Sequence, residues 1–119
     1  CIELERRSTT FLRIQDERTE ILYVLNVLDV LYVEALRKQC EIHLLGETIT
    51  MTIQFGRLIE LFAPYHFIQI HRSYLVNPAF INRIDMDMVR LDNGNELPVS
   101  RSRRQQVREL FFTWSRGGT

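Results

Sequence analysis

Three polar residues, His71, Arg72 and Ser73, interrupt two runs of apolar strand formers in the stretch FIQIHRSYLVNPAFINRI. Burying such groups without partners costs free energy, so we expect this interruption at the surface. Together with Tyr74 and Asn77 they offer guanidinium, hydroxyl and amide donors, the groups that proteins use on base edges and phosphate oxygens. The alternative is structural: His71 and Tyr74 pack half-buried, and Asn77 caps a turn.

A second polar cluster, VSRSRR, lies where a predicted strand enters a predicted helix. Hydroxyl groups, guanidinium groups and the first amides of a helix can converge there on a phosphate. The alternative for this cluster is a solvated arginine face. Its members are Ser100, Arg101, Ser102, Arg103 and Arg104.

Catalytic and metal chemistry find less support. His71, Ser73 and Asp85 could supply a nucleophile, a base and an orienting carboxylate, but the chain has no nucleophile elbow and no glycine-rich phosphate loop. Potential metal ligands have no pair at a recognised spacing. These ligands are Cys40, His43, His66, His71, Asp85 and Asp87. We therefore expect neither an enzyme nor a bound cofactor or metal.

The charge of the chain is balanced overall and uneven locally. Lys and Arg number 15, Asp and Glu number 15, and the formal net charge is zero, although nucleic-acid-binding modules usually carry a basic excess. Residues 98–108, PVSRSRRQQVR, hold four arginines and no acid. A local patch of this kind can attract a polyanion even when the whole molecule is neutral.

The length and the cysteine content bound the class of protein. A chain of 119 residues fits a single domain with one core, which we place at about residues 10–114, with 115–119 as a flexible tail. Cys1 and Cys40 form no disulfide framework, which favours a reducing compartment and a cytoplasmic protein. No apolar run reaches the roughly 20 residues of a membrane helix, so we expect no membrane contact. Because the chain begins at Cys1, we interpret it as a fragment of a longer protein.

Short strands account for most of the elements that must position these clusters. TFLRIQD and ILYVLN, separated by the charged DERTE, predict a first hairpin. LYVEALR, CEIHLL, ETITMTI, FIQI, YLV, FINRI and MDMVRL predict further strands, and NVLDV predicts a helical turn. Asn93-Gly94 predicts a tight hairpin, because both residues tolerate a positive φ.

The hydrophobic period changes to that of a helix at two places. Phe55, Leu58, Ile59 and Phe62 share one helical face that ends before Pro64, and the same spacing recurs over 103–114. Ser102 and Gln105 form a candidate capping box at the start of the second helix. The sequence therefore predicts an elongated, mostly antiparallel β domain, a sheet or sandwich, with two short helices.

The two polar clusters also carry a family resemblance. FIQIHRSYLVNPAFINRI, followed by VRLDNGNELPVSRSRRQQVREL, resembles the LytTR DNA-binding domain of LytR/AlgR-type bacterial response regulators, from about Ile21 to Leu110. The resemblance implies an elongated antiparallel β fold that inserts loops, not a recognition helix, into successive major grooves of double-stranded DNA. It implies no catalysis and no cofactor.

The resemblance also assigns residues. It implies that the loop after LYVEAL brings Arg37, Lys38 and Gln39 to DNA, although this loop lacks the glycine, asparagine and aromatic cluster of many members. It implies that Arg72 reaches base edges and Ser73 the DNA backbone, with His71 beside them in contact with DNA or bracing the loop. The second groove would receive Ser100, Arg101, Ser102 and Arg103, and the cations should share one face.

We interpret the chain as a sequence-specific DNA-binding domain of a bacterial two-component transcription regulator, used on promoter repeats as a possible homodimer. The alternative is a β-rich protein-interaction module, in which Arg72 and the arginines of VSRSRR bind an acidic partner. An RNA-binding module is less favoured, because the sequence offers no platform of exposed stacking aromatics.

Overall fold

The structure is a computed structural model that describes residues 10–117. Its strands are β1 (Phe11–Gln15), β2 (Leu22–Asn26), β3 (Val30–Ala35), β4 (Cys40–Leu44), β5 (Glu47–Met51), β6 (Ile68–His71), β7 (Tyr74–Val76), β8 (Ile81–Ile84), β9 (Met88–Leu91) and β10 (Glu96–Pro98). Its α-helices are α2 (Phe55–Phe62) and α3 (Arg104–Gly117), and short 3-10 turns cover Val27–Asp29, Ala63–Tyr65, Pro78–Phe80 and Arg101–Arg103.

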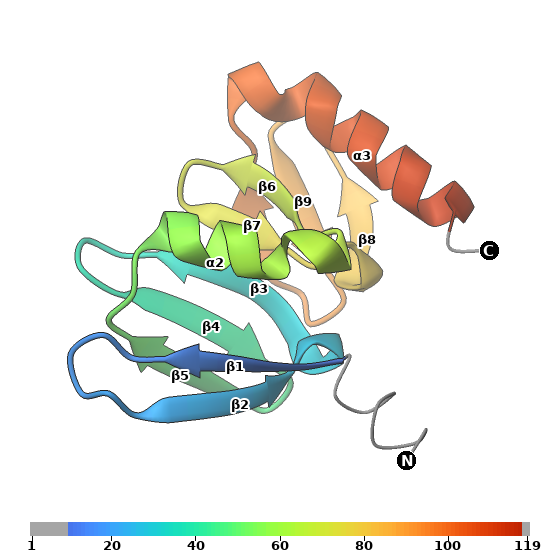
Figure 1. The fold of residues 1–119 in the computed structure, drawn as a ribbon. Helices are drawn as coiled ribbons and strands as arrows, with labels where there is room; N and C mark the ends of the chain where they lie inside the picture. The colour runs from blue at the N-terminus through green and yellow to red at the C-terminus, as the bar shows by residue number, and fades with distance from the viewer. Residues whose placement is uncertain (1–9, 118–119) are drawn as a thin grey trace, which may run out of the picture.

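The strands form three sheets in which every pair is antiparallel (Figure 1). A two-stranded ribbon has the order β1-β2, a five-stranded sheet has the order β5-β4-β3-β7-β6, and a three-stranded sheet has the order β10-β9-β8. The prediction of a mainly antiparallel β domain with two helices is confirmed. The extents of 39 × 38 × 24 Å make the domain a flattened plate, not the elongated body that we expected.

One hydrophobic core lies between the five-stranded sheet, the β1-β2 ribbon and α2. Leu58 and Phe62 are fully buried on the helix side and meet Val33 and Ile42 of the sheet in the same cluster. Ile14 joins them from β1. The helix forms here because its apolar residues recur at the helical period, as the sequence predicts.

A second core lies between the five-stranded sheet, the three-stranded sheet and α3. Val107 enters it from α3, next to buried residues of β6, β8, β9 and β10. Strands β3 and β7 contribute to both cores: Val33 and Leu75 belong to the first, and Tyr32 and Val76 belong to the second. These two strands are therefore a wall that both cores share.

Two buried polar side chains fix connections to the five-stranded sheet. Asn77 is 7% exposed; its Nδ2 donates to the carbonyl of Val30 at 2.9 Å, and its Oδ1 accepts from the N–H of Ala79 at 3.0 Å. Asp16 accepts from the N–H groups of Arg18 and Thr19 and, at 3.1 Å, from that of Thr52. The turn-capping role expected as the structural alternative for Asn77 is confirmed.

The hairpin at Asn93-Gly94 forms, but with a different turn from the one that the dipeptide predicts. Gly94 has a φ of +93°, whereas Asn93 has no positive φ. The N–H of Gly94 donates to the carbonyl of Leu91 at 2.9 Å, and the N–H of Leu91 donates to the backbone carbonyl of Asn95 at 2.9 Å. The connection is thus a longer loop in which the glycine alone adopts the left-handed conformation.

The last helix continues through Gly117, beyond the predicted end at Trp114, so Ser115 belongs to the helix and not to a tail. Residues 118–119 of the predicted tail lie outside the described residues. Cys40 is a buried free thiol, and Cys1 is also outside the described residues. Across residues 10–117, no helix has both the length and the apolar character to cross a bilayer.

Candidate nucleic-acid interface

Backbone hydrogen bonds bring the three predicted contact segments together. The N–H of Ala35, at the end of β3, donates to the carbonyl of Ser73 at 2.8 Å. The N–H of Ser100 donates to the carbonyl of Ile70 at 2.9 Å. The β6–β7 turn therefore lies between the β3–β4 loop and the segment that leads into α3, and all three occur on the left side of Figure 1.

The β6–β7 turn presents Arg72 outward on a braced backbone. Nδ1 of His71 accepts a hydrogen bond from the N–H of Ser73 at 3.1 Å, and the ring of His71 meets that of Tyr74 edge-on, with centroids 5.6 Å apart. His71 and Ser73 are half-buried, whereas Arg72 is exposed. His71 thus acts as a brace for the turn, and Arg72 is the side chain of this turn that extends into solvent.

The β3–β4 loop carries Arg37, Lys38 and Gln39, all of them exposed. The N–H of Leu36 donates to the carbonyl of Gln39 at 2.8 Å, which closes the loop tightly. A hollow beside it is also lined by Arg18 of the β1–β2 turn. The sequence predicts only a turn at DERTE, because the approach of Arg18 to the β3–β4 loop depends on the Asp16–Thr52 contact across 36 residues.

The segment before α3 departs from the predicted capping box. A 3-10 turn over Arg101–Arg103 precedes the helix, with Ser100 at its N-cap position and no side-chain capping bond. Nε2 of Gln105 donates instead to Oε1 of Glu109 at 3.1 Å, one helical turn later. The capping-box prediction is wrong because the first helical turn begins later, at Arg104.

Ion pairing separates the arginines of this region by role. Arg104 pairs with Asp87, and Arg83 pairs with Asp85 at 3.3 Å. Within the described part of the chain, the other basic side chains of the three segments have no acidic partner closer than 4.0 Å. These are Arg37, Lys38, Arg72, Arg101 and Arg103. Arg104 is thus a structural residue, and the five remaining cations are available to an anionic partner.

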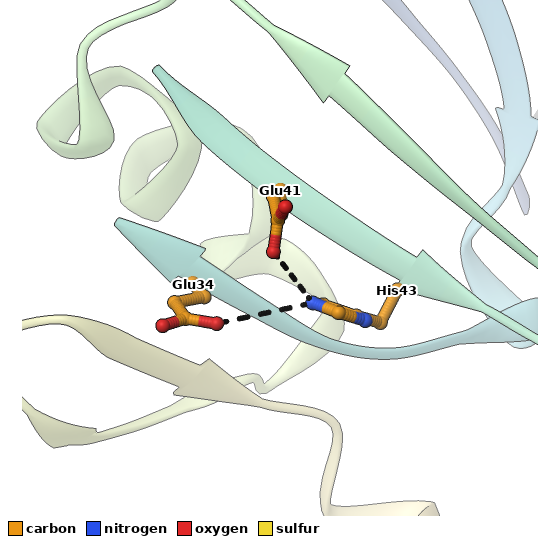
Figure 2. A group of neighbouring side chains, drawn as sticks. All are labelled: Glu34, Glu41 and His43. Atoms are coloured by element: carbon orange, nitrogen blue, oxygen red, sulfur yellow. Dashed lines mark ion pairs between the residues drawn. The ribbon is translucent and has the colours of Figure 1, made fainter. Parts of the chain in front are cut away.

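A cluster that sequence reasoning missed lies at the base of these loops. Glu34 of β3 stands directly opposite Glu41 of β4, and His43 points its ring between them (Figure 2). Burial, and after it the negative charge of Glu34, raises the pKa values of Tyr32 and Tyr74 beside this cluster. The register of β3 and β4 creates the cluster, and no spacing in the sequence reveals it.

Comparisons with known proteins agree on one family. The profile of the LytTr DNA-binding domain matches residues 20–112. The transcriptional regulatory protein YpdB of Escherichia coli K12 is 30% identical over 114 residues, covering 89% of this chain and 45% of YpdB; YpdB of Shigella flexneri gives the same values. The chain thus spans less than half the length of these curated relatives.

A solved structure shows the same fold. The LytTr DNA-binding domain of a methyl-accepting/DNA response regulator from Bacillus cereus is similar to this chain with a TM-score of 0.69 and 27% identity, over 82% of this chain and 94% of that domain. LytTR DNA-binding domains are not enzymes, so the interpretation of Ser73 as a catalytic nucleophile does not apply to this chain. With the family profile covering most of its length, the chain belongs to the LytTR family of DNA-binding domains.

Proposed function

We propose that this domain reads double-stranded DNA in a sequence-specific way by inserting its loops into successive major grooves. The β6–β7 turn presents Arg72 to base edges in one groove. The segment over 100–103 enters the next groove, and the β3–β4 loop adds contacts through Arg37, Lys38 and Gln39. Ser73 and Ser100 hold phosphate oxygens.

The observation that carries the proposal is the joining of three segments, distant in sequence, by two backbone hydrogen bonds. Each segment presents cations without an acidic partner in the described chain. The three segments therefore lie side by side, and their insertion into successive major grooves rests on the family resemblance.

Selection of bound duplexes from a random pool tests the proposal. We expect one enriched motif with two conserved blocks about one helical turn apart, since each groove is read by a different segment. Failure of any motif to rise above nonspecific duplex would contradict the proposal. Affinity for the selected duplex should fall log-linearly with salt, with a slope of roughly −3 to −5 if three to five cations neutralise phosphates.

The same titration separates DNA from an acidic protein partner. An acidic partner would show no dependence on duplex length and no base preference. Binding that is equally tight on a selected duplex, a scrambled duplex and an acidic polypeptide would therefore favour the protein-interaction alternative over the DNA proposal.

We further propose that the chain is the output domain of a longer bacterial regulator of the two-component type, which works in the cytoplasm and uses two copies on repeated promoter sites. The length of the relatives supports the first part, because the chain covers only 45% of YpdB. The second part rests on the family resemblance. A selected motif that occurs as a repeat with fixed spacing, bound by two chains per duplex, is the expected result.

A further inference from the structure

Glu34, Glu41 and His43 lie on the face of the five-stranded sheet opposite α2, and they converge from two adjacent strands (Figure 2). Nε2 of His43 is 3.3 Å from Oε1 of Glu41 and 4.0 Å from Oε1 of Glu34. One donor atom from each residue fits within 4.8 Å of the other two. We propose that these three side chains bind a divalent transition-metal ion of the Zn²⁺ class.

The charges on the β3–β4 strand pair favour a bound cation between Glu34 and Glu41. Glu34 and Glu41 occupy directly opposed positions in the β3–β4 register, and like charges in such positions destabilise a sheet. In the described part of the chain, no lysine or arginine forms an ion pair with either carboxylate. A bound divalent cation would remove this repulsion.

The imidazole of His43 is held in an orientation that suits a metal ligand. Nε2 of His43 is shielded from solvent and makes no hydrogen bond, although the Glu41 carboxylate is near. Its other nitrogen, Nδ1, lies 3.3 Å from Oγ1 of Thr48, and its ring stacks on that of Tyr32 at a centroid distance of 4.1 Å. When Nδ1 donates to Thr48, Nε2 carries the lone pair that a metal requires, and the stack fixes the ring plane.

The carboxylates show matching support. The hydroxyl of Tyr74 donates to Oε2 of Glu34 at 3.2 Å, which leaves Oε1 directed toward His43. Around tetrahedral Zn²⁺, donor atoms about 2.0–2.2 Å from the metal stand about 3.4 Å apart. The His43–Glu41 distance already has this value, and only the Glu34 carboxylate has to move inward.

The donor set selects the class of metal. Mg²⁺ and Ca²⁺ prefer oxygen ligands alone, whereas an imidazole with two carboxylates suits Zn²⁺ and neighbouring first-row ions. All three residues are partly exposed, and a water molecule would complete the four ligands that Zn²⁺ prefers. The site joins β3 to β4 at the base of the β3–β4 loop, and Tyr74 links it to β7; the choice of ion does not depend on the proposed DNA contacts.

The test measures zinc bound to the full 119-residue chain with Cys1→Ser as the background, so that the terminal thiol cannot contribute. After equilibrium dialysis near neutral pH we expect one zinc ion per chain, and much weaker retention of Mg²⁺. A concentration of Zn²⁺ about 100-fold above the dissociation constant should raise the folding equilibrium constant about 100-fold, seen as a higher melting temperature.

Two site variants and two matched controls locate the ion. Glu41→Gln and His43→Gln should each lose the bound zinc and the zinc-dependent rise in melting temperature. Glu47→Gln, on the neighbouring strand, and His66→Asn, which tolerates the left-handed backbone at that position (φ 67°), should keep both. Glu41→Gln without metal should fold at least as stably as the parent, because it removes the repulsion between the carboxylates of Glu34 and Glu41.

Other results of the zinc measurements would overturn the proposal. A chain that retains no zinc while it remains folded would overturn the proposal and leave His43 as a plain partner of the two carboxylates. Zinc that persists in both Glu41→Gln and His43→Gln, or disappears in His66→Asn, would place the ion elsewhere and overturn it as well.

Discussion

The N–H of Ala35 donates to the carbonyl of Ser73 at 2.8 Å, so the last residue of β3 holds the turn that presents Arg72. The bond joins residues 38 positions apart and sets Arg72 beside the loop that carries Arg37. Because both partners are backbone groups, substitution of a side chain in either loop leaves this link in place. The DNA contacts can therefore be tested without dismantling the surface.

Arg72→Ala should reduce discrimination more than general affinity. If its guanidinium forks onto a guanine, the loss on the preferred duplex should be roughly 1–3 kcal/mol, and much smaller on a scrambled one. Fluorescence anisotropy with both duplexes at matched salt measures the difference, and a melting curve shows that the fold is kept. Equal losses on the two duplexes would make Arg72 a phosphate contact.

Ser73→Ala and Ser100→Ala should weaken binding to all duplexes by similar factors, since a hydroxyl on a phosphate carries no base information. Ser100 makes no side-chain cap and Ser73 bonds through its backbone, so neither change should unfold the domain. The same pair of duplexes is the measurement. A loss confined to the preferred duplex would assign the hydroxyl to a base edge.

Arg101→Ala and Arg104→Ala should separate binding from stability. Arg101 is exposed and unpaired within the described residues. Its loss should make the salt dependence shallower, reducing the magnitude of the slope by about 1, and leave stability unchanged. Arg104 pairs with the exposed Asp87, and its loss should cost about 0.2–1 kcal/mol of stability with an unaltered slope.

A double-mutant cycle controls this comparison. If the pair stabilises the fold, Arg104→Ala combined with Asp87→Asn should cost less than the sum of the two single changes. Strict additivity in urea unfolding would show that Arg104 acts by packing alone.

Asn77→Ala should be among the more destabilising polar substitutions. It leaves the buried carbonyl of Val30 without its donor and removes the cap on Ala79, and an unsatisfied buried group costs about 1–3 kcal/mol. The urea midpoint measures this loss. Asn95→Ala, an exposed loop change, is the matched control and should stay within about 0.5 kcal/mol of the parent. Equal effects of the two changes would contradict the anchoring role of Asn77.

Asp16 should make stability depend on pH in acid. Hydrogen bonds from the N–H groups of Thr19, Thr52 and Arg18 lower the pKa of Asp16 from its ordinary value of 3.8, against the opposing effect of burial. A lowered pKa in the folded state means that this stabilisation is complete above pH 3.8 and is lost as the pH falls through the folded-state pKa.

The difference in stability between the parent and the Asp16→Asn variant should therefore become smaller as the pH falls from 5 toward 2. Urea midpoints of both proteins across this range make the measurement. A difference that stays constant with pH would show that the Asp16 carboxylate has the same pKa in the folded and unfolded chains.

Local patterns predicted the elements better than their ends. The helical period from Phe55 to Phe62 predicts α2, and the alternation of apolar and polar residues predicts strands such as β5. Burial of one face of a helix or strand imposes these patterns directly. The capping box at Ser102 failed because a 3-10 turn occupies that position, and capping depends on where the first helical turn closes. The Asn93-Gly94 turn differed because flanking hydrogen bonds, not the dipeptide, set the loop length.

The residues of the candidate surface were predictable only as separate segments. Arg72 and the arginines after Val99 stood out by type, but their adjacency depends on hydrogen bonds between β3, β6 and the loops. The pairing of Arg104 with Asp87 and the convergence of Glu34, Glu41 and His43 come from strand register and packing. Relations of this kind depend on the three-dimensional fold, so a single sequence does not display them.

The wall of β3 and β7 that serves both cores has a consequence for how the molecule opens. Neither half can detach alone without exposing apolar side chains of the other, so we expect unfolding as one cooperative transition. Amide protons of β3 should then exchange with solvent only as fast as the entire domain unfolds. The turn at Arg72 and the loop at Arg37 are both anchored to this slowest-exchanging part of the molecule.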